Sequence, residues 1–185
     1  MSQFVDRPSS AVVVIDVQVG VVHDAWHRDE VVANISEAVA HARAIKMPVI
    51  WVQHSDDWMA IGSNDWAIVP ELVPLENEAK IQKNYCSSFE ATNLEEVLAS
   101  MNIGHLVICG AQTNNCVRHT IHAALERGYD ITLIEDAHTT SDGDWDNGTL
   151  RAADIIDDQN RSCAGYQLPG RSATLIATRD LVGNN

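Results

Sequence analysis

The sequence predicts an α/β protein built as a three-layer, doubly wound sandwich, with six mostly parallel strands in the Rossmann-like order 3-2-1-4-5-6. Short apolar runs rich in β-branched residues alternate along the chain with segments of helical periodicity. Parallel neighbours need such crossover segments, and right-handed crossovers place helices on both faces of the sheet. At 185 residues the chain has the length of one ordinary domain, so we expect a single domain over residues 1–185.

Six segments are predicted as strands. Most are continuous apolar runs, which is typical of strands buried on both faces, and polar or turn-forming residues bound them. They lie at residues 11–17, 48–54, 79–83, 105–109, 130–136 and 173–178.

Four segments with apolar residues at helical spacing connect these strands, at residues 31–45, 92–101, 117–127 and 150–161. In the second of them, Thr92 and Glu95 have the spacing of a capping box, which predicts a helix start there. Residues 55–72 show no sustained period and predict a long surface loop.

Composition and charge restrict the function. The formal net charge of −14 repels phosphate backbones and anionic lipid, which disfavours nucleic-acid and membrane-surface partners. No apolar run is long enough to span a bilayer, and no signal peptide is predicted, so we expect a cytoplasmic protein. The cysteines are scattered without a CxxC pair, so each is expected to be a free thiol. They are Cys86, Cys109, Cys116 and Cys163.

Two charged residues stand at the ends of predicted strands. Asp16 interrupts a run of valine and isoleucine. Such a residue can simply cap a turn, but a desolvated carboxylate would have a raised pKa and could act as a base. Lys83 closes the third strand, where a lysine is usually solvated. If that strand ends at the same edge of the sheet, its ammonium could lie between Asp16 and Cys116.

Cys116 lies in the stretch GAQTNNCVRHT, residues 110–120, between an apolar run and a helical segment. Free cysteines are most often buried small hydrophobes. A cysteine near the first turn of a helix, however, faces free N–H groups and the helix dipole, which favour a thiolate. Asn114 or Asn115 could cap this helix and leave N–H groups free to bind an oxyanion.

Together these residues resemble the isochorismatase-like cysteine hydrolases, which include nicotinamidases, N-carbamoylsarcosine amidohydrolases and ureidoacrylate amidohydrolases. The resemblance rests on AVVVIDVQ around Asp16, on Lys83 ahead of SSF, and on the pattern G-x-x-T-x-x-C-V-x-x-T around Cys116. It implies that these three residues form a triad that cleaves a C–N bond of a small amide, ureide or carbamoyl compound through a thioester, without a cofactor.

The resemblance has further implications. It implies a cis peptide bond between Ala111 and Gln112, and an oxyanion hole made by the backbone N–H groups of Gln112 and Cys116. Family members also associate, so a homo-oligomer that acts on a small-molecule substrate is expected.

A substrate pocket is expected from polar and aromatic residues near the predicted active edge of the sheet, although aromatic residues in loops can also pin the loop or form a dimer contact. The expected pocket residues are Gln18, His54, Trp58, Trp66, Tyr85 and Phe89. Nicotinamidases similar to this sequence carry an Asp-x-His pattern and further histidines that bind a metal. Here His54 is followed by Asp56 and Asp57 but by no second histidine in the segment, so we predict no metal.

Three alternatives stay open. Family members that cleave an enol ether, as isochorismatases do, typically lack the cysteine, so Cys116 favours attack on an amide-type carbonyl. A nucleotide-binding oxidoreductase would need G-x-G-x-x-G after the first strand, where VQVGVVHD offers only Gly20. A non-catalytic protein of the same fold is disfavoured by the intact set of Asp16, Lys83 and Cys116. Cys86 and Cys163 have no assigned role.

Overall fold

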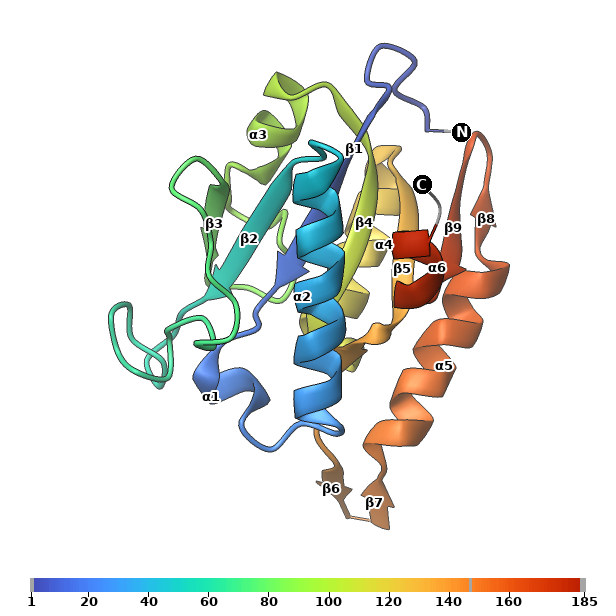
Figure 1. Ribbon diagram of the computed structural model, residues 1–185. Helices are drawn as coiled ribbons and strands as arrows, with labels where there is room; N and C mark the ends of the chain where they lie inside the picture. Colours follow the sequence, from blue (N-terminus) through green and yellow to red (C-terminus); the bar gives the residue numbers. More distant parts are fainter. Residues whose placement is uncertain (1, 147, 184–185) are drawn as a thin grey trace.

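A computed structural model describes residues 2–146 and 148–183, and a seven-stranded sheet runs through the centre of the protein (Figure 1). Its strands, in spatial order, are β3 (Ala79–Lys83), β2 (Val49–His54), β1 (Ser9–Ile15), β4 (Ile103–Ala111), β5 (Asp130–Thr139), β9 (Arg171–Ile176) and β8 (Gln167–Leu168). The first six are parallel and confirm the predicted order 3-2-1-4-5-6. The predicted count of six is one too low, because the two-residue strand β8 adds an antiparallel edge.

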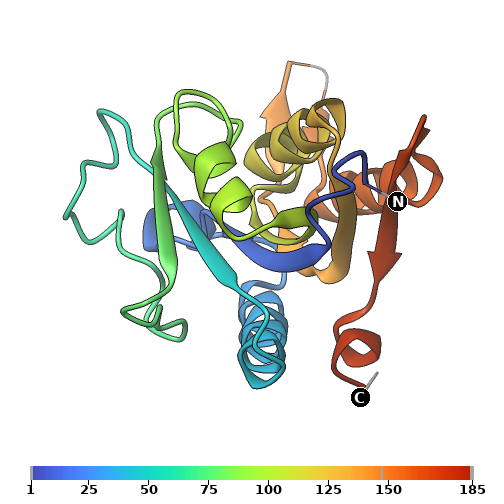
Figure 2. The same ribbon diagram turned by 90° about the horizontal axis from the view of Figure 1, so that it is seen from above.

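Helices cover both faces of this sheet. They are α1 (Val19–Val22), α2 (Arg28–Ala44), α3 (Leu94–Ser100), the π-helix η1 (Thr113–Val117), α4 (Arg118–Arg127), α5 (Ala152–Gly165) and α6 (Thr178–Gly183). Figure 2 shows α2 and α6 on one face and α3, α4 and α5 on the other, and the short hairpin of β6 (Gly143–Trp145) and β7 (Gly148–Leu150) stands apart from the sheet (Figure 1). None of the helices in the described part of the chain is long and apolar enough to cross a membrane.

The central strand β1 explains why the predicted apolar runs are continuous rather than alternating. Val13 and Ile15 pack into the core under α3 and α4, whereas Val12 and Val14 pack into the core under α2. All four side chains are buried, because helices cover both faces of a parallel sheet.

The predicted capping box at the start of α3 does not form. Thr92 Oγ1 accepts a hydrogen bond from the backbone N–H of Leu94, but Glu95 does not complete the reciprocal pair. Its Oε1 accepts hydrogen bonds from Arg7 Nη1 at 3.0 Å and from the Tyr129 hydroxyl at 2.7 Å. A tertiary contact to the N-terminal segment therefore overrides a local signal.

Gly110 allows β4 to approach β1 closely where both strands end. It pairs with Ile15 and has a φ of 119°, and a Cβ atom on it would lie 2.0 Å from the Ile15 carbonyl oxygen. Only glycine fits such an approach. The carboxyl ends of β1, β3 and β4 meet at one edge of the sheet, which is where ligands bind in folds of this type.

Candidate active site

Asp16, Lys83 and Cys116 meet at this edge of the sheet. Lys83 Nζ lies 2.6 Å from Asp16 Oδ2 and donates a hydrogen bond of 3.2 Å to Cys116 Sγ. Asp16 and Lys83 are fully buried, and Cys116 is 9% exposed. Three residues that are far apart in the sequence thus form one contact group, as the resemblance implies.

The strand ends hold the two charged members of this group. Asp16 directly follows β1 and has a φ of 48°, a left-handed conformation that Asp tolerates better than most residues. Its N–H donates to the Val52 carbonyl at 3.0 Å. At the end of β3, the Lys83 carbonyl accepts a hydrogen bond from Ser55 N–H, and the Asn84 side chain donates to the Ser55 carbonyl. These bonds tie the ends of β2 and β3 together.

Cys116 lies within the π-helix η1, which begins directly after Gln112. The Gln112 carbonyl accepts hydrogen bonds from the N–H groups of Asn115 and Val117, at 3.0 and 3.2 Å. The peptide bond between Ala111 and Gln112 is cis. Single π-turns occur often at functional sites, and both Gln112 and Cys116 line a pocket here.

Burial dominates the protonation of this group. Desolvation raises the pKa of Asp16 although Lys83 opposes the shift, and it raises the pKa of Cys116 to about 12 with help from Asp16. For Lys83, burial lowers the pKa, but Asp16 and Cys116 outweigh it and the net shift is upward. Burial therefore opposes the thiolate expected from the helix start: it shifts the Cys116 thiol towards its protonated form, whereas Lys83 is shifted towards its charged form.

A second polar group lies on the other side of η1. His138 is buried, its Nδ1 lies 2.9 Å from Thr113 Oγ1, and its Nε2 lies 2.9 Å from Asn160 Oδ1. Asn160 Nδ2 donates to the Glu135 carbonyl, so its oxygen faces His138 and must accept. His138 is then neutral with its proton on Nε2, and Thr113 donates to Nδ1. Burial lowers the pKa of His138 to about 4, against a smaller opposing effect of Asn160.

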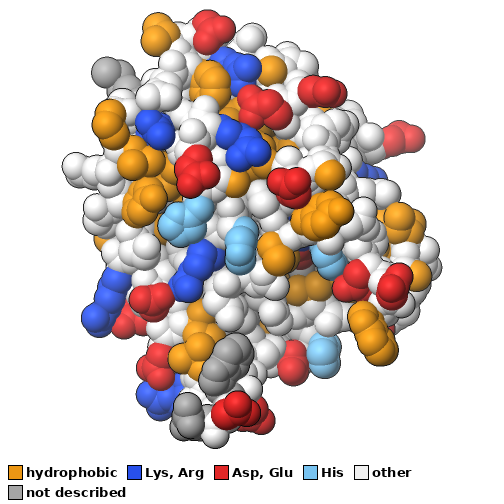
Figure 3. Space-filling model, turned by 180° about the vertical axis from the view of Figure 1, so that it is seen from behind, with side chains coloured by type: hydrophobic (Ala, Val, Ile, Leu, Met, Phe, Trp, Pro, Cys, Tyr) orange, Lys and Arg blue, Asp and Glu red, His pale blue; other side chains and the backbone are white. Residues whose placement is uncertain are grey.

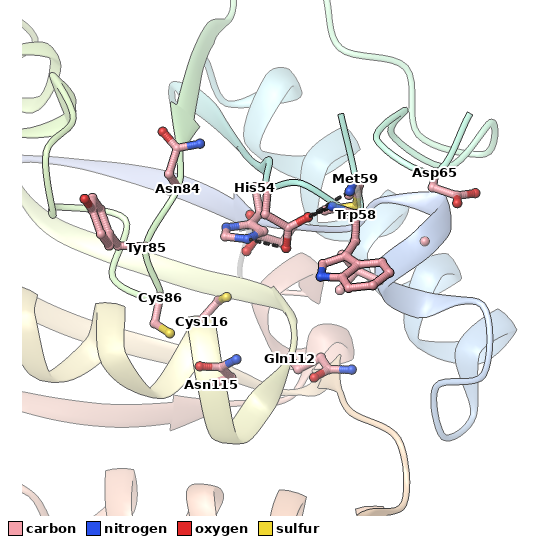
Figure 4. Close-up of a pocket in the computed structure, with 14 residues that line it drawn as sticks. His54, Trp58, Met59, Asp65, Asn84, Tyr85, Cys86, Gln112, Asn115 and Cys116 are labelled. Carbon is pink, nitrogen blue, oxygen red and sulfur yellow. Dashed lines mark hydrogen bonds and ion pairs between the residues drawn. The ribbon is translucent and has the colours of Figure 1, made fainter. Parts of the chain in front are cut away.

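An open pocket of about 570 Å³ lies above the Cys116 sulfur (Figure 4). Its lining consists of Asp16, Gly20, Val21, His54, Asp56, Trp58, Met59, Asp65, Asn84, Tyr85, Cys86, Gln112, Asn115 and Cys116. Of the expected pocket residues, His54, Trp58 and Tyr85 line it, and Trp58 is 93% exposed. A volume of this size suits a small molecule.

The sequence matches the family model described as the isochorismatase domain over residues 10–158. The chain belongs to the isochorismatase family. Among solved structures, an isochorismatase from Pseudomonas putida superposes with a TM-score of 0.84 at 28% sequence identity, with 91% of this chain and 88% of that chain covered. A cysteine hydrolase from Pseudomonas syringae pv. phaseolicola has the same fold, with a TM-score of 0.83 at 22% identity over 94% and 91% of the two chains.

Two relatives agree with this membership. The isochorismatase family protein YrdC of Bacillus subtilis is 33% identical over 181 residues, which are 94% of this chain and 95% of YrdC. The secreted isochorismatase effector Isc1 of Verticillium dahliae is 30% identical over 152 residues, which are 80% of this chain and 75% of Isc1. The protein is therefore a hydrolase of the isochorismatase family.

In this family member, three of the expected pocket residues lie outside the pocket lining. Gln18 is buried, and its amide donates to the carbonyls of His54 and Trp66 and accepts from His54 N–H, so it clamps the loop after β2. Trp66 takes part through its backbone carbonyl. Phe89 is buried in the core, with its ring centroid 5.8 Å from that of Tyr129. Proximity to the strand ends in the sequence does not say which way a side chain points.

Several lining residues escaped the sequence reasoning. Asn84 directly follows Lys83 and Asn115 directly precedes Cys116, so adjacency to these two residues was the available signal. Asp65 and Met59 lie in the loop without a sustained period, where no local pattern marks a pocket residue. Cys86 also lines the pocket, whereas Cys163 is buried against Gln159.

Other candidate ligand groups are limited. Among the residues that the structure describes, no group of three His, Cys, Asp or Glu side chains could hold a metal ion. A shallow surface groove on α4 has mixed charge, since Arg118 and Arg127 share it with Glu90 and Glu126. Basic, acidic and histidine side chains are likewise interspersed on the face shown in Figure 3.

Proposed function

We propose that the protein is a cysteine hydrolase that cleaves a C–N bond of a small amide, ureide or carbamoyl compound through a thioester on Cys116. One observation carries the proposal: Lys83 Nζ contacts both the Asp16 carboxylate, at 2.6 Å, and Cys116 Sγ, at 3.2 Å, at the base of an open pocket. A thiol, a base and a cation in mutual contact suit nucleophilic attack on a carbonyl carbon.

In the first half of the reaction, Asp16 takes the proton of the Cys116 thiol, and this raised-pKa carboxylate is basic enough to do so. The sulfur bonds to the carbonyl carbon, and the carbonyl electron pair moves onto oxygen. The backbone N–H groups of Gln112 and Cys116 would hold that oxyanion. Asp16 then gives its proton to the leaving nitrogen as the C–N bond breaks, which leaves a thioester.

In the second half, water replaces the amine. Asp16 takes one proton from the water, and the hydroxide adds to the thioester carbon. The C–S bond breaks, and the sulfur recovers its proton from Asp16. One water is consumed, and Lys83 stays protonated throughout. Its charge balances a single negative charge that moves between Asp16, the oxyanion and the sulfur.

The pocket lining supports an uncharged or cationic substrate over one that carries a carboxylate. Among the described lining residues, Asp56 and Asp65 are acidic and none is Lys or Arg. The Asp16 charge is already matched by Lys83. A carboxylate in the pocket would thus face acidic side chains without a lining cation to pair with. Neutral amides should therefore be turned over faster than analogues of the same size that bear a carboxylate.

The test is a screen of primary amides, ureides and carbamoyl compounds for ammonia or amine release. Cys116→Ala and Asp16→Asn should each lower turnover by on the order of 10³-fold or more, because each removes an atom that forms or breaks bonds. Cys86→Ser, which changes the second thiol of the pocket, should stay within about tenfold of wild type. Turnover by Cys116→Ala at the wild-type rate would overturn the proposal.

Hydrolysis of an enol ether is the competing reaction, and the names of the relatives support it. That reaction needs an acid or base at the position of Asp16 but no sulfur nucleophile. The variants Cys116→Ala and Asp16→Asn distinguish C–N bond cleavage from enol-ether cleavage. Enol-ether cleavage that survives Cys116→Ala but not Asp16→Asn would favour the ether hydrolase.

A further inference from the structure

His54 has contacts that the proposed mechanism leaves unused. It ends β2, its Nδ1 lies 3.4 Å from Lys83 Nζ, and its Nε2 lies 3.4 Å from Asp56 Oδ2. Figure 4 shows the ring between the Asn84 and Trp58 sides of the pocket. The imidazole thus joins the buried ammonium to a carboxylate that is 43% exposed.

The chemistry of these neighbours selects one form of the ring. A lysine ammonium has three donors and no acceptor, so the nitrogen that faces it must present a lone pair. His54 Nδ1 is therefore the acceptor, and the ring proton sits on Nε2, towards Asp56. Both distances are at the long end for hydrogen bonds, so the contacts act mainly through charge and orientation.

Asp56 and His54 are themselves held in place. Asp56 Oδ1 accepts hydrogen bonds from the backbone N–H groups of Trp58 and Met59, at 2.8 and 2.7 Å, which leaves Oδ2 for His54. The His54 backbone is clamped by the buried Gln18 amide, which accepts from its N–H at 2.7 Å and donates to its carbonyl at 2.9 Å. The ring therefore reaches Lys83 from a fixed position.

Lys83 needs such a contact because the negative charge beside it moves between Asp16 and Cys116 during the proposed reaction. Its Nζ also donates to the Tyr85 carbonyl at 3.2 Å, so the Asp16 ion pair is much the shortest of its contacts. A neutral acceptor beside Nζ holds the ammonium in one place while the negative charge moves from Asp16 to the sulfur and back.

We propose that His54, held by Asp56, is a positioning residue that keeps the Lys83 ammonium between Asp16 and Cys116. The inference rests on the proposed function. The charged and titratable groups around His54 are Lys83 from β3, Asp56 from the loop after β2 and Asp16 directly after β1. Cys116 from η1 is linked to it through Lys83. A proton on Nδ1 would point an N–H group at the ammonium and displace it.

Two variants of His54 test the role through kcat, with the best neutral amide from the screen as substrate. His54→Asn keeps an amide near the position of Nδ1, whereas His54→Gln carries its amide near the position of Nε2. We expect His54→Gln to lower kcat on the order of 10- to 100-fold with KM changed less than threefold, and His54→Asn to recover most of that loss. Equal kcat values for the two would overturn the inference, since a purely structural role would not distinguish them.

Asp56→Asn should move the His54 ring proton from Nε2 to Nδ1. Its Oδ1 can keep the two backbone N–H groups, but its Nδ2 then donates to His54 Nε2 and drives the ring proton to Nδ1, against Lys83. A loss of kcat as large as that of His54→Gln is expected. Asp57→Asn makes the same charge change one residue along, at an exposed position outside the pocket lining, and should stay within twofold of wild type.

The tautomer can be read without any substrate. Long-range ¹⁵N–¹H NMR at pH 8, with the His54 signal identified by its loss in His54→Asn, should show the proton on Nε2 in wild type and on Nδ1 in Asp56→Asn. A proton on Nδ1 in wild type would overturn the inference. Turnover that survives Cys116→Ala would instead overturn the proposed function and leave the NMR result to decide the Lys83 contact.

Discussion

The two sides of η1 carry buried polar groups of opposite character. On one side, Cys116 contacts Lys83, which is paired with Asp16. On the other side, Thr113 contacts His138, which is hydrogen-bonded to Asn160. All of these side chains are buried except that of Asn160, which is half-buried. The first holds an ion pair and a thiol, whereas the second is a chain of neutral hydrogen bonds in which each donor meets an acceptor.

The comparison shows how burial assigns charge in this protein. Desolvation pushes Asp16, Cys116 and His138 towards their neutral forms, and only Lys83 is shifted towards its charged form, because Asp16 and Cys116 outweigh its burial. The neutral chain is suited to holding η1 in place. The ion pair beside a protonated thiol is suited to moving a proton, because one cation can serve whichever partner is negative.

The largest effect should come from removing the cation that pairs with Asp16. Lys83→Met should abolish turnover and lower the free energy of unfolding by roughly 3 to 5 kcal/mol near pH 8, since it leaves a buried carboxylate without its cation. The Asp16 pKa would then rise further above its unfolded value. The deficit is present above that raised pKa and shrinks as the pH falls and the carboxyl group becomes protonated. Urea unfolding at pH 8 and pH 5 measures it.

The double variant Asp16→Asn, Lys83→Met is the control for this prediction. It removes both charges, so it should recover most of the lost stability while remaining inactive. A deficit in Lys83→Met that stays constant with pH would mean that the Asp16 carboxylate is not the unpaired group.

On the other side of η1, the contribution of the Thr113–His138–Asn160 chain to the free energy of unfolding should depend on pH. The pKa of His138 is about 4 in the folded protein against 6.5 for an ordinary histidine, so the folded state binds fewer protons than the unfolded state between these values. This contribution to stability is full above pH 6.5 and is lost as the pH falls, and the loss reaches about 3 kcal/mol below pH 4. In His138→Gln it is absent, so the stability difference between wild type and variant should shrink on acidification.

Denaturant unfolding from pH 7.5 to pH 4 measures this difference. His23→Gln, at an exposed surface position, controls for the loss of one imidazole group. Parallel curves for wild type and His138→Gln would show that the Thr113–His138–Asn160 chain is not held in its neutral form.

The smallest effect on activity and stability is expected from a change in the pocket above Cys116. Trp58→Ala should raise KM a few-fold and change the free energy of unfolding by less than about 0.5 kcal/mol, because the indole is 93% exposed but lines the pocket. Ile61→Ala, in the same loop but outside the lining, should change neither. Equal KM values for the two variants would remove Trp58 from the substrate site.

The order of the parallel strands was predictable because buried strands and amphipathic helices have different periods. The edge strand β8 and the β6–β7 hairpin were not, since strands of two or three residues have no periodic signal. The capping box failed because Glu95 has partners in Arg7 and Tyr129 that are distant in sequence. The single domain, the homo-oligomer and the cytoplasmic location stay predictions.

The position of His138 also depended on the tertiary structure. Ile108 pairs with Leu133, but Gly110, two residues later, pairs with His138, five residues later. This irregularity in β5 brings His138 beside η1. The pattern of strand-forming residues in DITLIEDAHT does not indicate where the register shifts, because the shift depends on how β5 fits against β4.

By itself, the sequence determined that Asp16, Lys83 and Cys116 stand at the same edge of the sheet, because Asp16 and Lys83 close parallel strands and Cys116 follows a third, and such strands end at one edge. Only the tertiary structure decided how close they come, that burial shifts the thiol towards its protonated form, and that His54 rather than Gln18, Trp66 or Phe89 reaches the charged group. The physical reason is that distance, burial and side-chain direction set these properties, and they arise from contacts between distant segments.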